Sequence, residues 1–151
     1  GCSQGGLVAA LTAAQMPETV NGLVLLYPAL CIPDAARAGE MLWLKFDPSH
    51  IPEKMHAGPM PLGRRYAADV MNMDAFRQIA GYSGKVLLLH GDRDTIVDIS
   101  YAEKAESVYR AAGADVRFVV IPGGKHIFRK PSQIRQATQE ITAFVRKMKG
   151  E

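Results

Sequence analysis

Short runs of apolar residues alternate along this chain with amphipathic segments. Three of the runs are continuous and rich in Val, Ile and Leu, as expected for strands buried on both faces. They lie at residues 23–27, 86–89 and 116–121. Longer segments with apolar residues at helical spacing begin near residues 4, 100 and 131. Because strands and helices alternate, the pattern predicts a parallel α/β sheet with right-handed crossovers.

Several residues mark where the predicted helices begin and end. Ser100 and Glu103 have the spacing of a capping box, and Gly113 suits the position just after a helix. Pro131 suits the first turn of the last helix. One face of that helix is expected to be buried through Ile134, Ala137, Ile141, Phe144 and Met148.

The stretch between the first two strands has a different composition. Six of the nine prolines fall between Pro28 and Pro61, and no alternation typical of strands is visible there. We expect an inserted cap of short helices and irregular loops at residues 29–80, outside the sheet. Its predicted helices are residues 34–44, 64–70 and 74–80. Residues 1–28 and 81–151 would then form the core.

Composition limits the classes of function. The 151 residues are 22% charged with a formal net charge of +3, as in a globular domain. The basic residues Arg146, Lys147 and Lys149 suit a solvated helix end, so we expect no nucleic-acid partner. No apolar run approaches the ~18 residues of a membrane span. We therefore expect no membrane partner. The compartment stays open, with the cytoplasm favoured, and a homodimer is compatible with the sequence.

The first residues of the chain carry the clearest motif. Residues 1–5 read Gly-Cys-Ser-Gln-Gly, which has the Gly-x-Ser-x-Gly form of a nucleophile elbow. Glycines allow a very sharp strand-to-helix turn, which exposes the hydroxyl of Ser3. The backbone N–H of Gln4 would then face a developing oxyanion. The alternative is an ordinary turn in which Ser3 only caps the following helix.

Two further loops supply polar residues that complete a catalytic set. Residues 90–97 follow the second predicted strand, and residues 122–126 follow the third. The carboxyl ends of parallel strands meet at one edge of a sheet. A serine hydroxyl needs a base, and the imidazole needs a carboxylate to orient it. Ser3, Asp94 and His126 provide these groups in the chain order of α/β-hydrolases.

Together these motifs resemble the second half of an α/β-hydrolase, along essentially the whole chain. More narrowly, Gly-x-Ser-Gln-Gly-Gly, residues 25–29 and residues 47–52 resemble bacterial cinnamoyl (feruloyl) esterases. The resemblance implies a partial α/β-hydrolase fold with three parallel strands, flanking helices and an inserted helical cap. It also implies a serine esterase that cleaves carboxylic esters, with hydroxycinnamoyl esters as candidate substrates and no metal or organic cofactor.

The resemblance also ranks the candidate site residues. The family pattern places the carboxylate four residues after the strand-end His90, which favours Asp94 over Asp92, and Asp92 would cap the turn. His90 is expected to be structural, and Cys2 to be a buried bystander. His50 and His56 are interpreted as ordinary cap residues. An aromatic acyl pocket in the cap would be lined by Trp43, Phe46, Met60 and Tyr66, which could equally pack the cap.

Relatives with this resemblance carry further strands before the elbow and a loop that donates a second oxyanion N–H. We therefore expect the N-terminal part of the fold to be missing here. The 151 residues alone are expected to be inactive or weakly active.

Two other classes of function remain open. A serine peptidase of the prolyl-oligopeptidase type shares all three motifs, and residues 104–118 look similar to such enzymes. A non-catalytic hydrolase-like binding module is the second alternative, and the intact set of Ser3, Asp94 and His126 argues against it. A nucleotide-binding loop at residues 1–6 is excluded because no Gly-Lys-Ser/Thr follows.

Overall fold

The computed structural model describes residues 1–41, 44–57 and 60–150. The chain divides into two compact units, residues 1–30 with 76–151 and residues 31–75. The smaller unit is thus an insertion between two parts of the larger one, and the proposed cap at residues 29–80 overlaps it.

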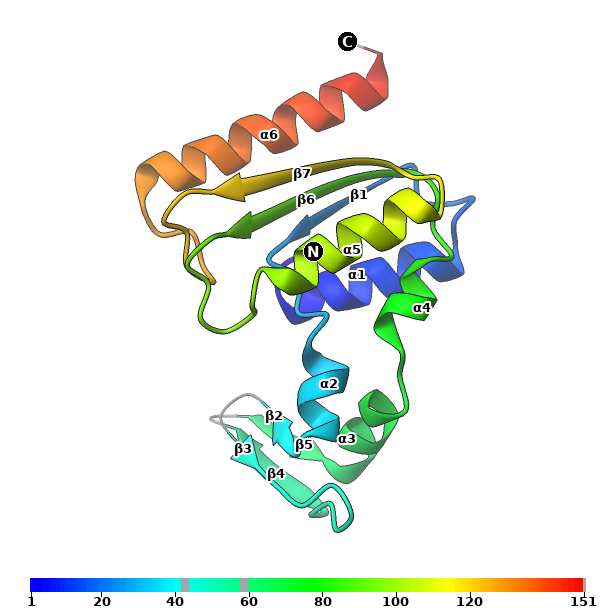
Figure 1. Ribbon diagram of the computed structural model, residues 1–151, viewed down its shortest axis with the longest axis vertical. Coiled ribbons are helices and arrows are strands. Elements are labelled where there is room, and N and C mark those ends of the chain that lie inside the picture. Colours follow the sequence, from blue (N-terminus) through cyan, green and yellow to red (C-terminus); the bar gives the residue numbers. More distant parts are fainter. Residues whose placement is uncertain (42–43, 58–59, 151) are drawn as a thin grey trace. The chain divides into compact units, whose positions relative to one another are not determined.

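The larger unit contains a three-stranded parallel sheet (Figure 1). Its strands are β1 (Gly22–Leu26), β6 (Lys85–Gly91) and β7 (Asp115–Ile121), in the order β1-β6-β7. The central strand β6 is buried at every residue after Lys85, because it has a strand on either side and helices on both faces of the sheet. The three predicted strands and their parallel pairing are therefore confirmed.

Helices cover both faces of this sheet. Figure 1 shows α6 (Pro131–Lys149) on one face, and α1 (Gln4–Gln15) and α5 (Ser100–Ala111) on the other. Ala137 and Phe144 of α6 pack in one buried cluster with Leu87, Leu89 and Ile121 of the sheet.

The predicted burial of Ile134 is wrong, because that side chain is 50% exposed. Its neighbour Gln133 is buried instead. The amide of Gln133 donates to the carbonyl of Pro122 at 3.2 Å and accepts the N–H of Lys130 at 3.4 Å. These hydrogen bonds offset the cost of burying a polar side chain.

The predicted capping box of α5 is also wrong. Ser100 is the first residue of the helix, and the N-cap position is occupied by Ile99, whose side chain makes no capping hydrogen bond. The carboxylate of Asp98 accepts the backbone N–H of Ser100 at 2.9 Å. A hydrogen bond from the Ser100 side chain, together with this backbone one, lowers the pKa of Asp98. The C-terminus agrees with the prediction, because Gly113 has a φ of 85° just after the helix.

The inserted unit contains strands as well as helices. In chain order its elements are α2 (Ile32–Arg37), β2 (Glu40–Met41), β3 (Leu44–Lys45), β4 (Lys54–Ala57), β5 (Met60–Gly63) and α3 (Arg64–Met71), and α4 (Ala75–Ile79) follows at its end. Strands β2 and β3 form one antiparallel pair, and β4 and β5 form another. The expectation of a cap made only of helices and loops is therefore wrong, and α2 ends before the predicted residue 44.

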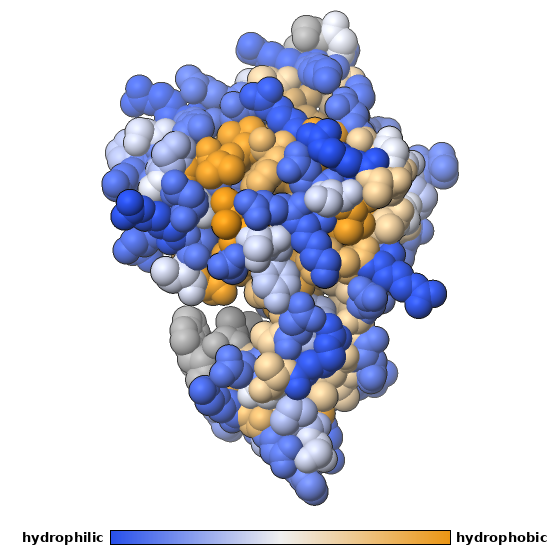
Figure 2. Space-filling view, viewed as in Figure 1, coloured by the Kyte–Doolittle hydropathy of each residue, from blue (hydrophilic) through white to orange (hydrophobic). Residues whose placement is uncertain are grey.

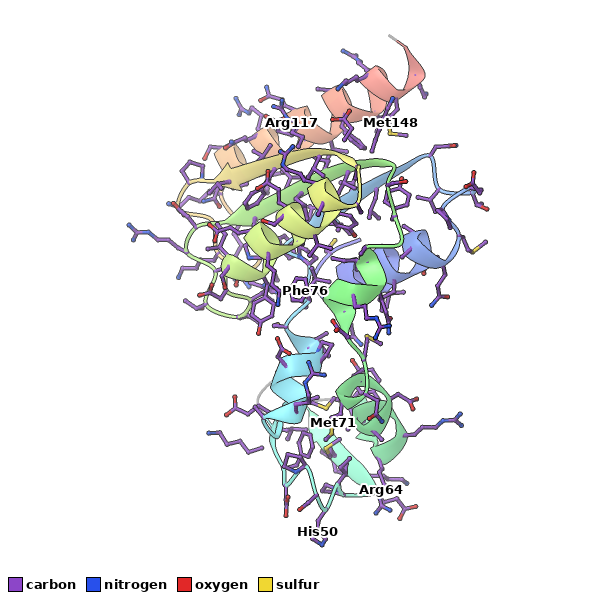
Figure 3. All side chains as sticks on the ribbon, turned by 45° about the vertical axis from the view of Figure 1, so that its right-hand side comes forward. His50, Arg64, Met71, Phe76, Arg117 and Met148 are labelled. Carbon is purple, nitrogen blue, oxygen red and sulfur yellow. The ribbon has the colours of Figure 1, made fainter. Side chains whose placement is uncertain are left out.

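The insertion has a small core of its own. Its buried residues are Ala36, Met41, Met55, Ala67 and Val70. The guanidinium of Arg37 donates to the carbonyls of Met71 and Met73, both at 2.9 Å, and so ties α2 to the end of α3. Figure 3 shows Met71 among the side chains of this unit.

The surface is mixed in polarity. On the face shown in Figure 2, hydrophilic side chains dominate and apolar ones form separate patches. Within the part of the chain that the structure describes, no helix combines the length and apolar character needed to cross a membrane.

Candidate active site

Ser3 lies at a sharp turn between the start of the chain and α1. Its φ of 50° is unusual for a residue with a side chain. Its N–H donates to the carbonyl of Leu26 at 3.0 Å, and its carbonyl accepts the N–H of Ala29 at 2.9 Å. Its side chain makes no capping hydrogen bond to the helix, unlike the serine of an ordinary helix start. The backbone is therefore held in the elbow geometry, and the hydroxyl is directed elsewhere.

Close packing explains two of the glycines in this turn. A Cβ on Gly1 would lie 2.2 Å from the carbonyl oxygen of Gly5, and one on Gly6 would lie 2.9 Å from the Cα of Pro28. A Cβ on Gly5 would meet nothing within 4 Å. The steric demand that the Gly-x-Ser-x-Gly pattern suggests at residue 5 therefore lies at residue 6.

This difference predicts opposite effects for two neighbouring substitutions in α1. Gly6→Ala is expected to lower the free energy of unfolding by about 1–3 kcal/mol, because Pro28 must move. Gly5→Ala is expected to leave it unchanged or raise it by up to about 1 kcal/mol, through helix propensity. Urea unfolding of the two variants measures both effects. Equal losses in the two variants would contradict the packing explanation.

His126 links Ser3 to Asp94 through hydrogen bonds. Its Nε2 lies 2.8 Å from Ser3 Oγ, and its Nδ1 lies 2.9 Å from Asp94 Oδ2. A carboxylate only accepts hydrogen bonds, so Nδ1 carries the proton and Nε2 is left to accept the hydroxyl of Ser3. The structure thus brings together the three residues that the sequence selected.

Asp94 is held by more than the imidazole. Its side chain has no exposed surface. Its Oδ1 accepts the backbone N–H groups of Ile96 at 2.9 Å and Val97 at 3.0 Å. These bonds compensate for burying the charge and fix the carboxylate toward His126.

His90, which the sequence predicted to be a structural residue, also lies next to this carboxylate. The residue is buried, and its Nε2 donates to the carbonyl of Val97 at 2.9 Å. The same nitrogen lies 3.2 Å from Asp94 Oδ2. His90 therefore adds to the polar environment of Asp94 from the end of β6. The four-residue spacing between His90 and Asp94 was the feature of the sequence from which their contact could have been predicted.

The loops that carry Asp94 and His126 are bound to each other. Arg93 N–H donates to the carbonyl of Gly124 at 2.9 Å, and Asp92 Oδ1 accepts the N–H of Gly123 at 2.6 Å. A Cβ on Gly91 would lie 2.1 Å from that Gly124 carbonyl oxygen, so the backbones need a glycine here. Asp92 thus bridges the two loops, whereas the imidazole bonds to Asp94.

Tyr27 is a further neighbour of His126. Their ring centroids are 4.9 Å apart, and Phe128 packs edge-on against the other side of Tyr27 at 5.1 Å. Burial raises the pKa of the Tyr27 phenol, and nearby Cys2 and Asp94 raise it further. The phenol is therefore neutral at ordinary pH. Its φ of 38° comes directly after β1, whereas the sequence placed Tyr27 within the predicted strand at residues 23–27.

The sequence also gave predictions for two other residues of the elbow, Gln4 and Cys2. Gln4 is the first residue of α1, so its backbone N–H lies at the positive end of the helix dipole, next to Ser3. Cys2 is exposed, and the expectation that it is buried is wrong. It forms a single parallel bridge with Leu26, at the rim of the sheet where few atoms cover it.

The inserted unit contains a second group of the same three residue types. His50 Nδ1 lies 3.0 Å from Ser49 Oγ and 3.2 Å from Asp47 Oδ2. The His50 side chain is 85% exposed and projects outward in Figure 3. Hydrogen bonds from Ser49 lower the pKa of Asp47. In this solvated turn the residues cap one another, and they lack the buried carboxylate of the Ser3 group.

The predicted acyl-pocket residues fall in the same unit. Phe46 and Tyr66 are partly buried and pack against its core, and burial raises the pKa of Tyr66. Trp43 lies outside the described residues. Among the described residues, no three His, Cys, Asp or Glu side chains gather as a metal site would require.

Comparison with protein families matches residues 1–151 to one model, that of the prolyl oligopeptidase family. The chain belongs to the prolyl oligopeptidase family. It is thus part of a serine hydrolase family, and its resemblance to α/β-hydrolases is confirmed. A comparison with curated protein sequences finds no significant match.

Solved structures with the same fold include several esterases. Est1E from Butyrivibrio proteoclasticus, solved with ferulic acid bound, has a TM-score of 0.90 and 30% identity, and the match covers 100% of this chain. The chain spans 59% of the length of Est1E. An esterase domain from Rhodothermus marinus has a TM-score of 0.72 and 20% identity, with 97% of this chain and 59% of that domain covered. A puromycin hydrolase has a TM-score of 0.72 and 16% identity, with 99% and 21% covered. The last two show the fold alone.

Proposed function

We propose that this family member hydrolyses carboxylic esters through an acyl-enzyme formed on Ser3. The observation that carries the proposal is the continuous row of hydrogen bonds from Ser3 through His126 to the buried Asp94, at 2.8 and 2.9 Å. His126 would take the hydroxyl proton at Nε2 while Ser3 Oγ attacks the ester carbonyl. It would then return that proton to the departing alcohol, and repeat the exchange with water to release the acid.

Asp94 and Gln4 have supporting roles in this proposal. Asp94 would keep the Nδ1 proton in place and stabilise the imidazolium that forms. The N–H of Gln4 would hold the negative oxygen of the tetrahedral intermediate, where one such donor is typically worth about 10²–10³ in turnover. The position of Gln4, first in a helix of 12 residues, supports this role through the helix dipole.

For the acyl group we propose a hydroxycinnamate. The support is the 30% identity and TM-score of 0.90 with Est1E, whose structure holds ferulic acid. We further propose that the inserted unit acts as a cap and shapes the acyl pocket, with Trp43, Phe46 and Tyr66 as its lining.

A peptidase is the second candidate, and the match to the prolyl oligopeptidase family favours it. Both reactions use the same acyl-enzyme chemistry, so the hydrogen-bonded row does not discriminate between them. A non-catalytic binding module is disfavoured, because binding alone does not require a serine held against a histidine.

The test uses the full-length protein that contains this chain. It should react with a fluorophosphonate probe at Ser3, identified by mass spectrometry of the labelled peptide, and should hydrolyse methyl ferulate. The peptide substrate benzyloxycarbonyl-Gly-Pro-p-nitroanilide is the competing assay. Faster turnover of the anilide than of any ester would favour the peptidase, and no labelling of Ser3 would remove both enzyme proposals.

A further inference from the structure

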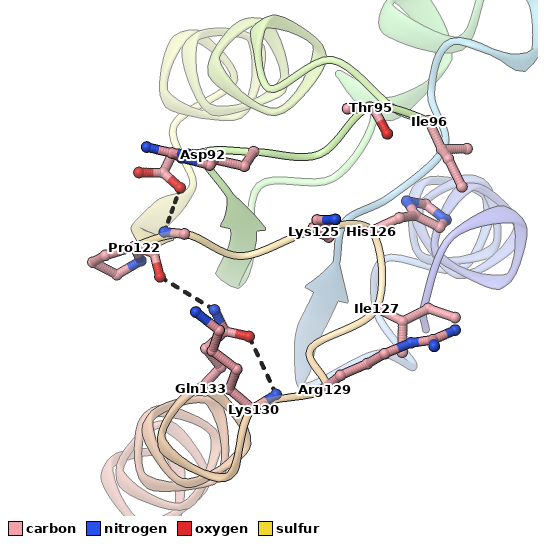
Figure 4. A pocket seen from close by; sticks show the side chains of 12 residues that line it. Asp92, Thr95, Ile96, Pro122, Lys125, His126, Ile127, Arg129, Lys130 and Gln133 are labelled. Atoms are coloured by element: carbon pink, nitrogen blue, oxygen red, sulfur yellow. Dashed lines mark hydrogen bonds between the residues drawn. The ribbon is translucent and has the colours of Figure 1, made fainter.

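A depression of about 920 Å³ lies between the loop that carries Asp94 and the loop that carries His126 (Figure 4). His126 is part of its wall, together with residues 92–93, 95–96, 122–123, 125, 127, 129–130 and 133. The depression is thus adjacent to the imidazole that bonds to Ser3. Neither the proposed chemistry nor the family match assigns a role to it.

Positive charge is concentrated in this wall. Arg93, Lys125, Arg129 and Lys130 all line the depression, against the single carboxylate of Asp92. That carboxylate already accepts the N–H of Gly123 at 2.6 Å, as the dashed line in Figure 4 marks.

The four cations have no acidic partner among the described residues. None of them forms an ion pair with a residue in the described part of the chain. Elsewhere in the described part of the chain, basic residues pair with carboxylates, among them Arg37, Lys45, Arg65, Arg110, Arg117 and Lys147. Unneutralised like charges around one concave surface raise the local concentration of anions.

The wall also contains apolar surface. Ile96 is 56% exposed and Ile127 is 53% exposed, and both line the depression. Exposed isoleucines next to cations suit an organic anion, which has a carbon frame to cover them, better than a small inorganic ion.

The position beside His126 indicates which part of a substrate would lie there. In acyl transfer the imidazole returns its proton to the leaving oxygen, so the alcohol half of an ester departs next to His126. We infer that this depression binds the alcohol half of the substrate and selects alcohols that carry a negative charge, such as a carboxylate. The inference rests on the proposed ester hydrolysis.

The test compares two chromogenic esters that differ by one carboxylate on the alcohol half. These are 5-acetoxy-2-nitrobenzoate and 4-nitrophenyl acetate, assayed with the full-length protein. We expect a higher kcat/KM for the carboxylate ester, and a preference that weakens as salt rises from about 0.01 to 0.5 M, because screening shortens the reach of charges. The double variant Lys125→Gln/Arg129→Gln should lower the ratio of the two kcat/KM values about four-fold, at roughly two-fold per exposed charge.

Lys149→Gln is the matched control, because Lys149 is a basic residue in the last turn of α6, whereas the depression lies at its first turn. Each variant is checked for folding by circular dichroism and for the active serine by fluorophosphonate labelling. An unchanged ratio in the double variant, or an equal change in the control, overturns the inference while leaving ester hydrolysis in place.

A binding measurement separates failure of the inference from failure of the proposed function. Titration calorimetry with 5-hydroxy-2-nitrobenzoate and with 4-nitrophenol reports binding of the alcohol half without turnover. We expect tighter binding of the carboxylate compound, and loss of that difference in the double variant. If neither these esters nor methyl ferulate is hydrolysed, the proposed function falls, and equal binding of the two compounds then overturns the anion site as well.

Discussion

Replacing Ser3 with alanine is expected to lower kcat for ester hydrolysis by about 10⁶ and to abolish fluorophosphonate labelling. The reason is that Ser3 Oγ is the atom that would form the acyl bond, 2.8 Å from the His126 Nε2 that would take its proton. The measurement is steady-state hydrolysis of methyl ferulate by the full-length protein and its variant.

Ser107→Ala provides the control for this substitution. Ser107 is exposed on α5, where its hydroxyl donates to the carbonyl of Glu103 at 3.0 Å. Its loss should leave both turnover and labelling unchanged. Residual labelling of the Ser3→Ala protein would show that another residue is the reactive one.

Asp94→Asn is expected to lower kcat by about 10⁴. An asparagine can turn an N–H toward His126 Nδ1, and the imidazole then presents its proton, rather than its lone pair, to Ser3. The 2.9 Å contact between Nδ1 and Oδ2 would be kept with the wrong proton arrangement. Stopped-flow or steady-state assays with 4-nitrophenyl acetate measure the loss.

Asp92→Asn tests the competing carboxylate at the same loop. An asparagine at residue 92 can still accept the N–H of Gly123 with its amide oxygen, so we expect a loss of less than about ten-fold. A larger loss for Asp92→Asn than for Asp94→Asn would contradict the assignment of Asp94 as the residue that orients His126.

Features encoded within a few neighbouring residues could be predicted from the sequence. The strands at residues 23–27, 86–89 and 116–121 are continuous apolar runs, and the elbow is a compact motif. Asp94 and His126 could be placed near Ser3 because parallel strands end at one edge of the sheet. For these residues, local pattern and topology together were sufficient.

Features that depend on contacts between distant residues could not be predicted in this way. Gln133 is buried because the Pro122 carbonyl and the Lys130 N–H reach its amide, which a hydrophobic pattern cannot reveal. The short strands β2 to β5 have too few residues for an alternating pattern, and Pro61 lies within one of them. The four cations of the depression are spread over residues 93–130 and meet only where two loops adjoin.

The inserted unit of residues 31–75 lies within a single crossover, between β1 and β6. It contains none of Ser3, Asp94 and His126. None of the residues paired in the parallel sheet lies within it either. Lengthening such a connection costs only about 0.6 kcal/mol for each doubling of its length. Evolution can therefore extend, shorten or replace this segment among relatives at little thermodynamic cost, while the geometry around Ser3 is preserved.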